Sequence, residues 1–379
     1  MQTSELSKLL ADLVSICSVN AMGREGPSSS ERMVCYLERW LNRHGIECHW
    51  QSAGSEHDLI ATLPGPKGAP TIVFDAHTDT VPAPGWADRA FIPRIEDGRL
   101  YGRGACDTKG CMTAMLWALA EAARAPEKLA SNIVFLASAD EEYGRTGVKA
   151  YLDSRPDVQY AIVGEPTMLQ PVVACKGAAR WDIVVPGASA HSSTPRKGTN
   201  AITRAAQVLT AIENFEHEVL ARKSHPLVQD ATMTPTMIHG GSAPNVVPDM
   251  CRVHVDLRTM PNEDPAAAAR SAQVYLEEEL DFALQHENLR TWRGADLSPD
   301  HPLVRRVRAC AAQVRQDEAQ PLGVNYGCHA SDFMERGIPA VVIGPGDISV
   351  AHAVDEYLEL EQLPKAVALY LALMTEPIE

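Results

Sequence analysis

Two histidines and several carboxylates of this 379-residue chain follow buried-type apolar segments, although they lie far apart in the sequence. They are His77 after 71–76, Glu141 and Glu142 after 132–138, Glu165 after 160–164, and His352 after 339–343. In open α/β sheets, ligands and catalytic groups collect at the carboxyl ends of strands. Histidine nitrogens and carboxylate oxygens together suit zinc or a related divalent ion. The pattern predicts a metallohydrolase.

The motif around His77 contains a second acidic group. Asp79 follows two residues later, and a carboxylate there can hold the ring nitrogen that does not bind metal. Asp79 is therefore a candidate for orienting His77, not a ligand. Taken alone, the His-x-Asp motif also fits a core histidine with satisfied hydrogen bonds.

A glycine-rich segment, 101–110, contains Asp107 and leads into a helix expected at 109–124 from the spacing of its apolar residues. Glycines let a backbone approach another group closely, whereas an aspartate before a helix can cap its first turn. Both roles fit Asp107, and the metal-type residues at strand ends favour a ligand. Cys106 precedes it, and packing is favoured over a catalytic thiol.

The adjacent Glu141 and Glu142 are expected to have separate roles. Neighbouring side chains of an extended turn point to opposite sides, so one can bind metal while the other faces the substrate. A carboxylate beside an activated water can act as its general base. A solvated acidic turn is the alternative, since Asp140 is also acidic.

The composition limits the class of protein. Hydrophobic content of 45% with 22% charged residues indicates a globular chain, and a net charge of −15 argues against nucleic acid or anionic membrane as partner. Nine scattered cysteines without a C-x-x-C pair indicate reduced thiols. The amphipathic N-terminus lacks a signal-peptide core, and no apolar stretch is long enough to span a membrane, so a cytoplasmic protein is expected.

The order of the expected elements predicts two domains. Apolar strands alternate with helices over the first 170 residues, which predicts a largely parallel sheet covered on both faces. From 176 to 292 a strand–helix–strand–strand–helix order, with helices at 200–215 and 265–284, predicts an inserted antiparallel α+β domain. The α/β pattern then resumes and ends with a helix at 363–374. The first domain is thus expected to be discontinuous, with parts 1–175 and 293–379.

Several blocks resemble the acetylornithine deacetylase and succinyl-diaminopimelate desuccinylase family of dizinc aminoacylases and exopeptidases. The similar blocks occur in the family order along nearly the whole chain. They are 75–82, 101–110, 140–142, 164–167, 176–177, 190–193, 198–201, 240–245, 256–258, 344–346 and His352. The resemblance implies a zinc-peptidase-type catalytic domain and an inserted ferredoxin-like lid and dimerisation domain.

The resemblance also implies a site with two Zn²⁺ ions, for which Co²⁺ or Mn²⁺ could substitute. His77 and Glu165 would bind one ion, Glu142 and His352 the other, and Asp107 would bridge both. Glu141 would be the general base and Asp79 would orient His77. The Asp107–Thr108 peptide would be cis, as in relatives.

Further expectations from the resemblance concern the inserted domain. His191 would stabilise the oxyanion from the partner subunit of a homodimer formed through this domain. Arg258 and Asn245 would hold the α-carboxylate of a small-molecule N-acyl amino acid, since arginine matches a carboxylate with two donors. For Arg258, a surface ion pair is the alternative.

The favoured function is hydrolysis of an N-acyl-L-amino acid, most similar to the acetylornithine deacetylase step of arginine biosynthesis, which gives acetate and a free amino acid. A desuccinylase or a dipeptide-cleaving exopeptidase is the alternative with the same metal chemistry. A non-catalytic ligand-binding member would lack a ligand or the base, and none is missing here. His329 and Asp332 could read the distal part of the substrate or pack a turn, and the sequence leaves both roles open.

Overall fold

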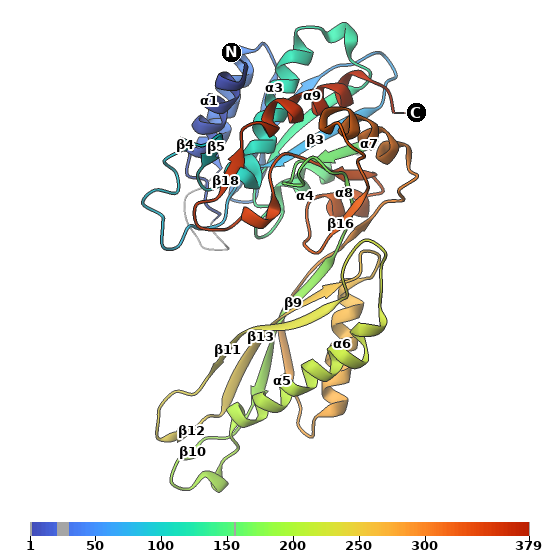
Figure 1. Cartoon of the computed structure of the whole chain (residues 1–379). Coiled ribbons are helices and arrows are strands. Elements are labelled where there is room, and N and C mark those ends of the chain that lie inside the picture. Colours follow the sequence, from blue (N-terminus) through green and yellow to red (C-terminus); the bar gives the residue numbers. More distant parts are fainter. Residues whose placement is uncertain (1, 21–29, 155–156, 379) are drawn as a thin grey trace. The chain divides into compact units, whose positions relative to one another are not determined.

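The computed structural model describes residues 2–20, 30–154 and 157–378, which form two compact units (Figure 1). The first unit comprises Met1–Val173, Leu297–Leu322 and Cys328–Glu379, and the second comprises Ala174–Asp296 and Gly323–Gly327. The segment 323–327 was expected in the first domain. It groups with the second because Lys176 N donates to Val324 O and Gln229 N donates to Asn325 Oδ1.

Continuous apolar strands form the centre of the sheet in the first unit. Its parallel core has the order β6-β3-β7-β17, with bounds Asn132–Ser138, Thr71–His77, Tyr160–Val163 and Ala340–Val342. The flanking strands β2 (Glu56–Leu63), β1 (Cys48–Ala53) and β8 (Val172–Cys175) pair antiparallel. Short strands β16 (Leu322–Val324) and β15 (Ala295–Asp296) pair with β8. The expected mostly parallel sheet is confirmed, with antiparallel flanks.

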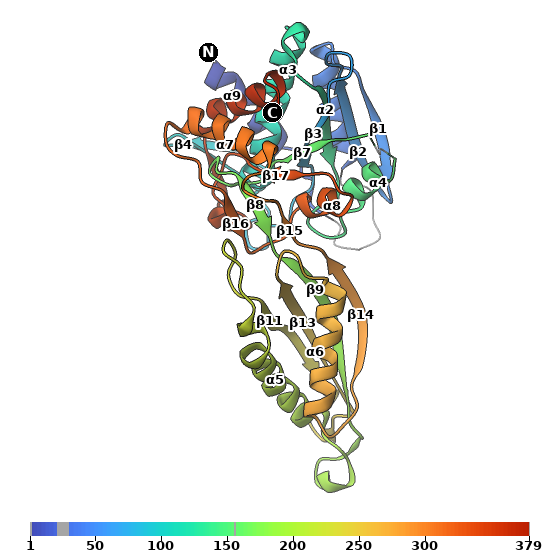
Figure 2. The same ribbon diagram turned by 90° about the vertical axis from the view of Figure 1, so that its right-hand side faces the viewer.

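Two groups of helices cover this sheet (Figure 2). One group consists of α1 (Gln2–Val14), α3 (Gly110–Ala123), α7 (Pro302–Arg315) and α9 (Gln362–Thr375). The other consists of α2 (Glu31–Arg43) and α4 (Thr146–Ser154) on β1 and β2, with α8 (Ala330–Glu335) on β7 and β17. Among the described residues, no helix is both long enough and apolar enough to cross a membrane.

A small three-stranded sheet connects two distant parts of the first unit. It has the order β18-β5-β4, with bounds Tyr357–Glu359, Arg99–Tyr101 and Arg94–Glu96. Pairing of β18 with β5 places the glycine-rich segment after Tyr101 beside the segment that follows His352. Short helical turns complete the unit at Ala105–Lys109, Pro126–Lys128 and Ile348–Val350.

The second unit has a strand–helix–strand–strand–helix–strand order. Its elements are β9 (Gly177–Pro186), α5 (Ala201–Glu218), β11 (Thr232–Gly240), β13 (Met250–Thr259), α6 (Pro265–Glu279) and β14 (Gln285–Trp292). The antiparallel sheet order β11-β13-β9-β14 is the ferredoxin-like arrangement. Strands β10 (Ala190–His191) and β12 (Val246–Val247) form a separate ladder, and turns lie at Pro195–Lys197 and Leu220–Arg222.

The core of the second unit lies between its sheet and the helices α5 and α6. Along β13, alternate residues are buried, from Cys251 to Leu257, because successive side chains of a strand point to opposite faces. The intervening positions carry charged residues such as Arg252, which pairs with Asp182 on β9. Helix α5 begins after Asn200, whose side chain caps the first turn.

Candidate metal centre and catalytic site

His77 ends the buried strand β3 and is itself buried. Its Nδ1 lies 3.0 Å from the backbone carbonyl of Asp79 and 3.6 Å from the Asp79 carboxylate. Since a carbonyl only accepts, Nδ1 carries the proton and Nε2 of the neutral ring has the lone pair. The residue expected to orient His77 therefore does so mainly through its backbone oxygen.

Asp107 lies between two imidazoles. Its Oδ1 is 3.0 Å from His77 Nε2 and its Oδ2 is 3.2 Å from His352 Nε2. The Asp107–Thr108 peptide is cis, which confirms the expectation. Asp107 is not the helix cap, because α3 begins after Lys109.

Two glutamates complete the cluster. Glu142 Oε1 lies 3.0 Å from His352 Nε2, and ligand atoms of His77, Asp107 and Glu142 all lie within 4.8 Å of one another. Glu165 follows β7 and is 5% exposed. Burial and the Asp107 charge raise the pKa of Glu165 well above its usual range. Glu165 is therefore under the electrostatic influence of Asp107.

The charges of this cluster are mutually dependent. Burial and the Asp107 charge raise the pKa of Glu142 to about 7. Burial opposes ionisation of Asp107, but hydrogen bonds with His352 and His77 prevail and lower its pKa. The same bonds to Asp107 and Glu142 raise the pKa of His352 to about 10. Crowded carboxylates of this kind are ionised together only with positive charge between them, and otherwise some of them hold a proton.

The donor set fits a divalent ion. The Nε2 lone pair of His77 and an Asp107 oxygen face each other at 3.0 Å, a separation that requires a cation or a proton between two electron-pair donors. Donors that share one zinc ion lie about 2.0–2.2 Å from it, so they lie about 2.8–3.6 Å from one another, depending on the angle at the ion. The observed separations match that spacing.

The carboxylate of Asp79 fixes the turn that carries the paired glutamates. It accepts the backbone N–H groups of Glu141 at 3.0 Å and Glu142 at 3.2 Å, and the side-chain amide of Asn20 at 2.7 Å. Glu142 faces His352, whereas Glu141 Oε1 lies 3.6 Å from Arg145 Nη2. The two side chains are 10% and 11% exposed, so the turn is not a solvated acidic one.

The sequence analysis did not identify two residues that hydrogen-bond to the backbone of the proposed ligands. Glu356 Oε1 accepts the backbone N–H groups of Cys106 and Asp107, and Arg103 Nη2 donates to the carbonyl of His352 at 3.2 Å. The available signals were weak: an arginine between Gly102 and Gly104, and a glutamate four residues after His352.

The structure also places residues whose roles were left open. His329 is buried and its Nδ1 lies 2.8 Å from Asp75 Oδ2, while Asp332 accepts from Arg145 Nη1 at 3.0 Å. Burial raises the pKa of the Cys106 thiol well above its usual range, and its Sγ donates to the carbonyl of Asp347. A buried protonated thiol is a poor nucleophile, which agrees with a packing role.

The remaining candidates belong to the second unit. Pairing of β10 with β12, together with the bond from Ser192 N to Asn245 O, brings His191 and Asn245 together. His191 Nδ1 accepts from Ser193 N at 3.1 Å, so Nε2 of the neutral ring carries the proton. Arg258 lies on β13 instead, and its Nε is 2.8 Å from Asp256 Oδ1. The ion pair given as the alternative for Arg258 is therefore present.

Comparison with known proteins agrees with the site. Residues 73–376 match the model of Peptidase family M20/M25/M40. The chain belongs to this family. It is 34% identical to acetylornithine deacetylase of Myxococcus xanthus, over 89% of this chain and 90% of that protein. It is 30% identical to acetylornithine deacetylase of Proteus mirabilis, over 93% and 92%. This M20 family member is a metal-dependent hydrolase of amide bonds.

Solved structures share the fold. The M20 family metallo-carboxypeptidase of Sulfolobus solfataricus has a TM-score of 0.80 at 18% identity, over 98% of both chains. A tripeptidase of Staphylococcus aureus has a TM-score of 0.79 at 20% identity, also over 98% of both. A Bacillus subtilis member described as a dinuclear metal-binding peptidase has a TM-score of 0.72 at 15% identity, over 99% of this chain and 98% of that one.

Proposed function

We propose that this chain is a two-metal N-acyl-L-amino acid amidohydrolase, acting most like acetylornithine deacetylase to release a carboxylate such as acetate and a free amino acid. The observation that carries the proposal is the single carboxylate of Asp107 between the imidazoles of His77 and His352. A carboxylate with a histidine on each oxygen suits a bridge between two ions. The similarity of this chain to relatives named acetylornithine deacetylase supports an acetylated substrate.

Five residues would hold the ions: His77 and Glu165 one, Glu142 and His352 the other, with Asp107 shared. Zinc suits this nitrogen and oxygen set, and cobalt or manganese can occupy the same ligands. Bound ions supply Lewis acidity toward the scissile carbonyl and lower the pKa of water. Asp107 and Glu165 are buried and the Glu142 side chain is only 10% exposed, so two divalent charges would make the burial of these carboxylates much less costly.

Glu141 would act as the general base and then as the general acid. Its carboxylate takes the proton of the attacking water and delivers it to the nitrogen of the leaving amine. The new C–O bond to the water oxygen thus replaces the C–N bond of the amide, and the proton ends on the amine. Low exposure supports this role, because a carboxylate shielded from bulk water keeps the proton for the amine. Asp79 holds the backbone of Glu141 in place through its 3.0 Å hydrogen bond.

The second unit would supply the remaining groups. His191 presents a protonated Nε2 suited to a developing oxyanion, and we propose that it acts on the partner subunit's site. Asn245 and Arg258 would bind the substrate carboxylate. For Arg258 this requires the substrate to compete with Asp256, whose carboxylate also pairs with Arg180.

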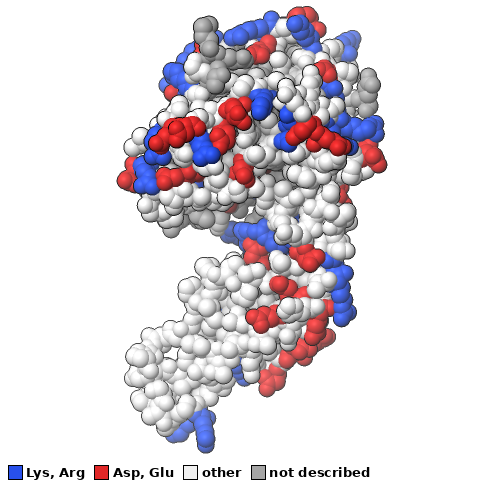
Figure 3. All heavy atoms as spheres, viewed as in Figure 1, with Lys and Arg blue, Asp and Glu red and all other residues white. Residues whose placement is uncertain are grey.

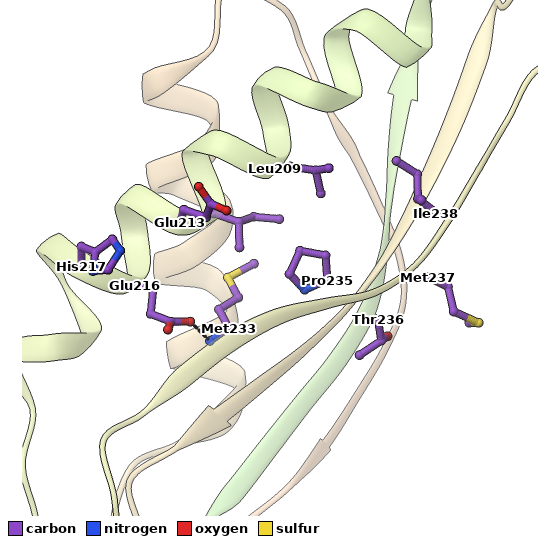
Figure 4. Close-up of a pocket in the computed structure, with 10 residues that line it drawn as sticks. Leu209, Glu213, Glu216, His217, Met233, Pro235, Thr236, Met237 and Ile238 are labelled. Atoms are coloured by element: carbon purple, nitrogen blue, oxygen red, sulfur yellow. Dashed lines mark hydrogen bonds between the residues drawn. The ribbon is translucent and has the colours of Figure 1, made fainter.

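A homodimer through the second unit is supported by the edge strand β11. Residues 231–248 contain no Lys, Arg, Asp or Glu, and Figure 3 shows a broad surface of the second unit without these residue types. Met237 and Ile238 on β11 are 54% and 48% exposed. A groove of about 390 Å³ lies between α5 and β11, lined by residues such as Leu209, Met233 and Pro235 (Figure 4). An uncharged sheet edge is suited to pairing with a second copy of the same strand.

The cytoplasmic location expected from the sequence stays a prediction.

The test is a hydrolysis panel with zinc- or cobalt-loaded protein. The substrates are N-acetyl-L-ornithine, N-acetyl-L-citrulline, N-acetyl-L-methionine, N-succinyl-L,L-diaminopimelate and several dipeptides, with Glu141→Ala as the blank. Preference in kcat/KM for an acetylated amino acid supports the proposal. Preference for the succinyl compound or a dipeptide contradicts the substrate assignment, and no hydrolysis of any amide contradicts the function.

A further inference from the structure

Arg145 is a buried cation that is bonded to several groups of the segment beginning α8. It is 6% exposed, and its Nη1 donates to Asp332 Oδ2 at 3.0 Å, to Ser331 Oγ at 3.0 Å and to the carbonyl of Cys328 at 3.1 Å. Its Nη2 lies 3.6 Å from Glu141 Oε1. One guanidinium therefore connects the start of α8 with the carboxylate of the proposed base.

The conformation of the turn does not require an arginine at position 145. Arg145 has φ +55°, a region that L residues other than asparagine and aspartate seldom adopt. The turn itself is held by Asp140, which accepts from Gly144 N and from the hydroxyl of Thr146. Burying an arginine is costly unless it is paired. The fold thus accommodates both a disfavoured backbone conformation and a buried charge at this position.

The surroundings of Arg145 argue against a substrate-binding role. Asp332 already balances its charge at 3.0 Å, and three acceptors occupy Nη1. An arginine that recognises a substrate carboxylate needs a pair of parallel donors directed outward. The geometry instead leaves Nη2 facing Glu141 at a distance longer than a hydrogen bond, where charge attraction restrains the carboxylate without taking a lone pair from it.

We propose that Arg145, anchored by Asp332, is a positioning residue for Glu141, and that this pair aims the base at the attacking water. The inference rests on the proposed function, since it assigns a partner to the base of that reaction. The bonded partners of Arg145 (Cys328, Ser331 and Asp332) belong to the segment that begins α8, and its Nη2 lies beside Glu141. Its loss should therefore reduce kcat and leave ion binding and KM nearly unchanged.

A double-mutant cycle tests the proposal. Arg145→Ala, Glu141→Ala and the double variant are compared with wild type by kcat, KM, bound zinc per chain and thermal unfolding. Arg336→Ala is the matched control, because Arg336 makes an exposed ion pair with Asp153 at the end of α8. Arg145→Ala should lower kcat about 10- to 100-fold with KM within about threefold, since a base misplaced by a fraction of an ångström loses rate. In the Glu141→Ala background the same change should have no further effect.

Two further variants keep the proposal testable if Arg145→Ala folds poorly. Arg145→Lys keeps the charge without the fork and should give an intermediate kcat with full zinc content. Asp332→Asn keeps the shape of the anchor and should lower kcat in the wild-type background only. Equal losses with and without Glu141, or loss of zinc, would show a structural role and overturn the proposal.

The controls separate this proposal from the proposed function. Wild-type protein without amide hydrolysis, or Glu141→Ala with full activity, would sink both together. An active wild type, an inactive Glu141→Ala and an unaffected Arg145→Ala would remove the positioning role alone.

Discussion

Arg103 and Glu356 form a buried ion pair between positions 253 residues apart, with Nη1 and Oε2 separated by 2.5 Å. The other Glu356 oxygen accepts from Cys106 N and Asp107 N, while Arg103 also donates to the carbonyl of His352. One pair thus fixes the backbone at two proposed ligands. Outer partners of this kind set the orientation of metal ligands and therefore the affinity of the ion.

Glu356→Gln should weaken zinc binding by about 10- to 100-fold and lower the unfolding temperature, because the buried Arg103 loses its counter-charge. Zinc affinity is measured by competition with a coloured chelator, and stability by circular dichroism. Glu359→Gln is the control, because it alters the partly exposed pair of Glu359 on β18 with Arg99 on β5. Equal zinc affinity in both variants would contradict the role of Glu356.

The buried Asp58 should make stability fall as pH rises. Burial raises the pKa of Asp58 to about 7, and one of its oxygens has no hydrogen-bond partner within the described part of the chain. Between pH 4 and 7 the folded state holds a proton on Asp58 that the unfolded state releases. The contribution of the protonated carboxyl to stability is therefore complete below the pKa of the unfolded state, and it is lost as the pH rises through the pKa of the folded state. The loss is on the order of 4 kcal/mol.

Asp58→Asn removes this titration. The difference in unfolding free energy between wild type and variant should shift in favour of the variant from pH 4 to pH 8, measured by urea denaturation at each pH. The exposed Asp88→Asn is the control, and its difference from wild type should stay flat. A flat difference for Asp58→Asn as well would show that Asp58 is already ionised at low pH.

Much of the site could be predicted because short sequence patterns indicate both the strands and the residues that follow them. Apolar runs marked β3, β6 and β7, and the metal-type residues after them could then be placed at one sheet edge. Strand β14 could not be predicted, because Gln285–Trp292 is an edge strand with mostly exposed side chains and no apolar alternation. Its neighbour α6 was expected to reach 284 and ends at Glu279.

The supporting contacts were beyond sequence reasoning for a different reason. Arg103 meets Glu356, and Arg145 meets Asp332 across 187 positions, so nothing local to either residue indicates its partner. The bond from His77 to the Asp79 carbonyl depends on the bend of the strand end, which a residue pattern does not specify.

If His191 acts across a dimer, two inactive variants should complement each other. Mixing Glu141→Ala with His191→Ala subunits, followed by verified exchange, should restore about a quarter of wild-type activity, because half of the dimers are mixed and each has one intact site. No recovery after exchange would show that His191 acts within its own chain or has no role in the reaction.

Met237→Lys should convert the proposed dimer into monomers, since it places a charge on the edge strand β11. Molar mass is measured by light scattering after size exclusion. Val274→Lys on α6 is the control, because Val274 is 52% exposed and lies on a different element. A wild-type monomer, or a dimer unaffected by Met237→Lys, would contradict this interface.

The most direct test of the metal centre is a zinc titration of metal-free protein, with heat of binding and hydrolysis of N-acetyl-L-ornithine followed together. We expect two ions per chain, activity that appears as they bind, and an Asp107→Asn variant that loses both tight binding and turnover. Glu141→Ala should still bind two ions while kcat falls by about 10²–10⁴. Full hydrolysis by the metal-free protein, or unchanged zinc binding in Asp107→Asn, would contradict a two-metal site that depends on Asp107.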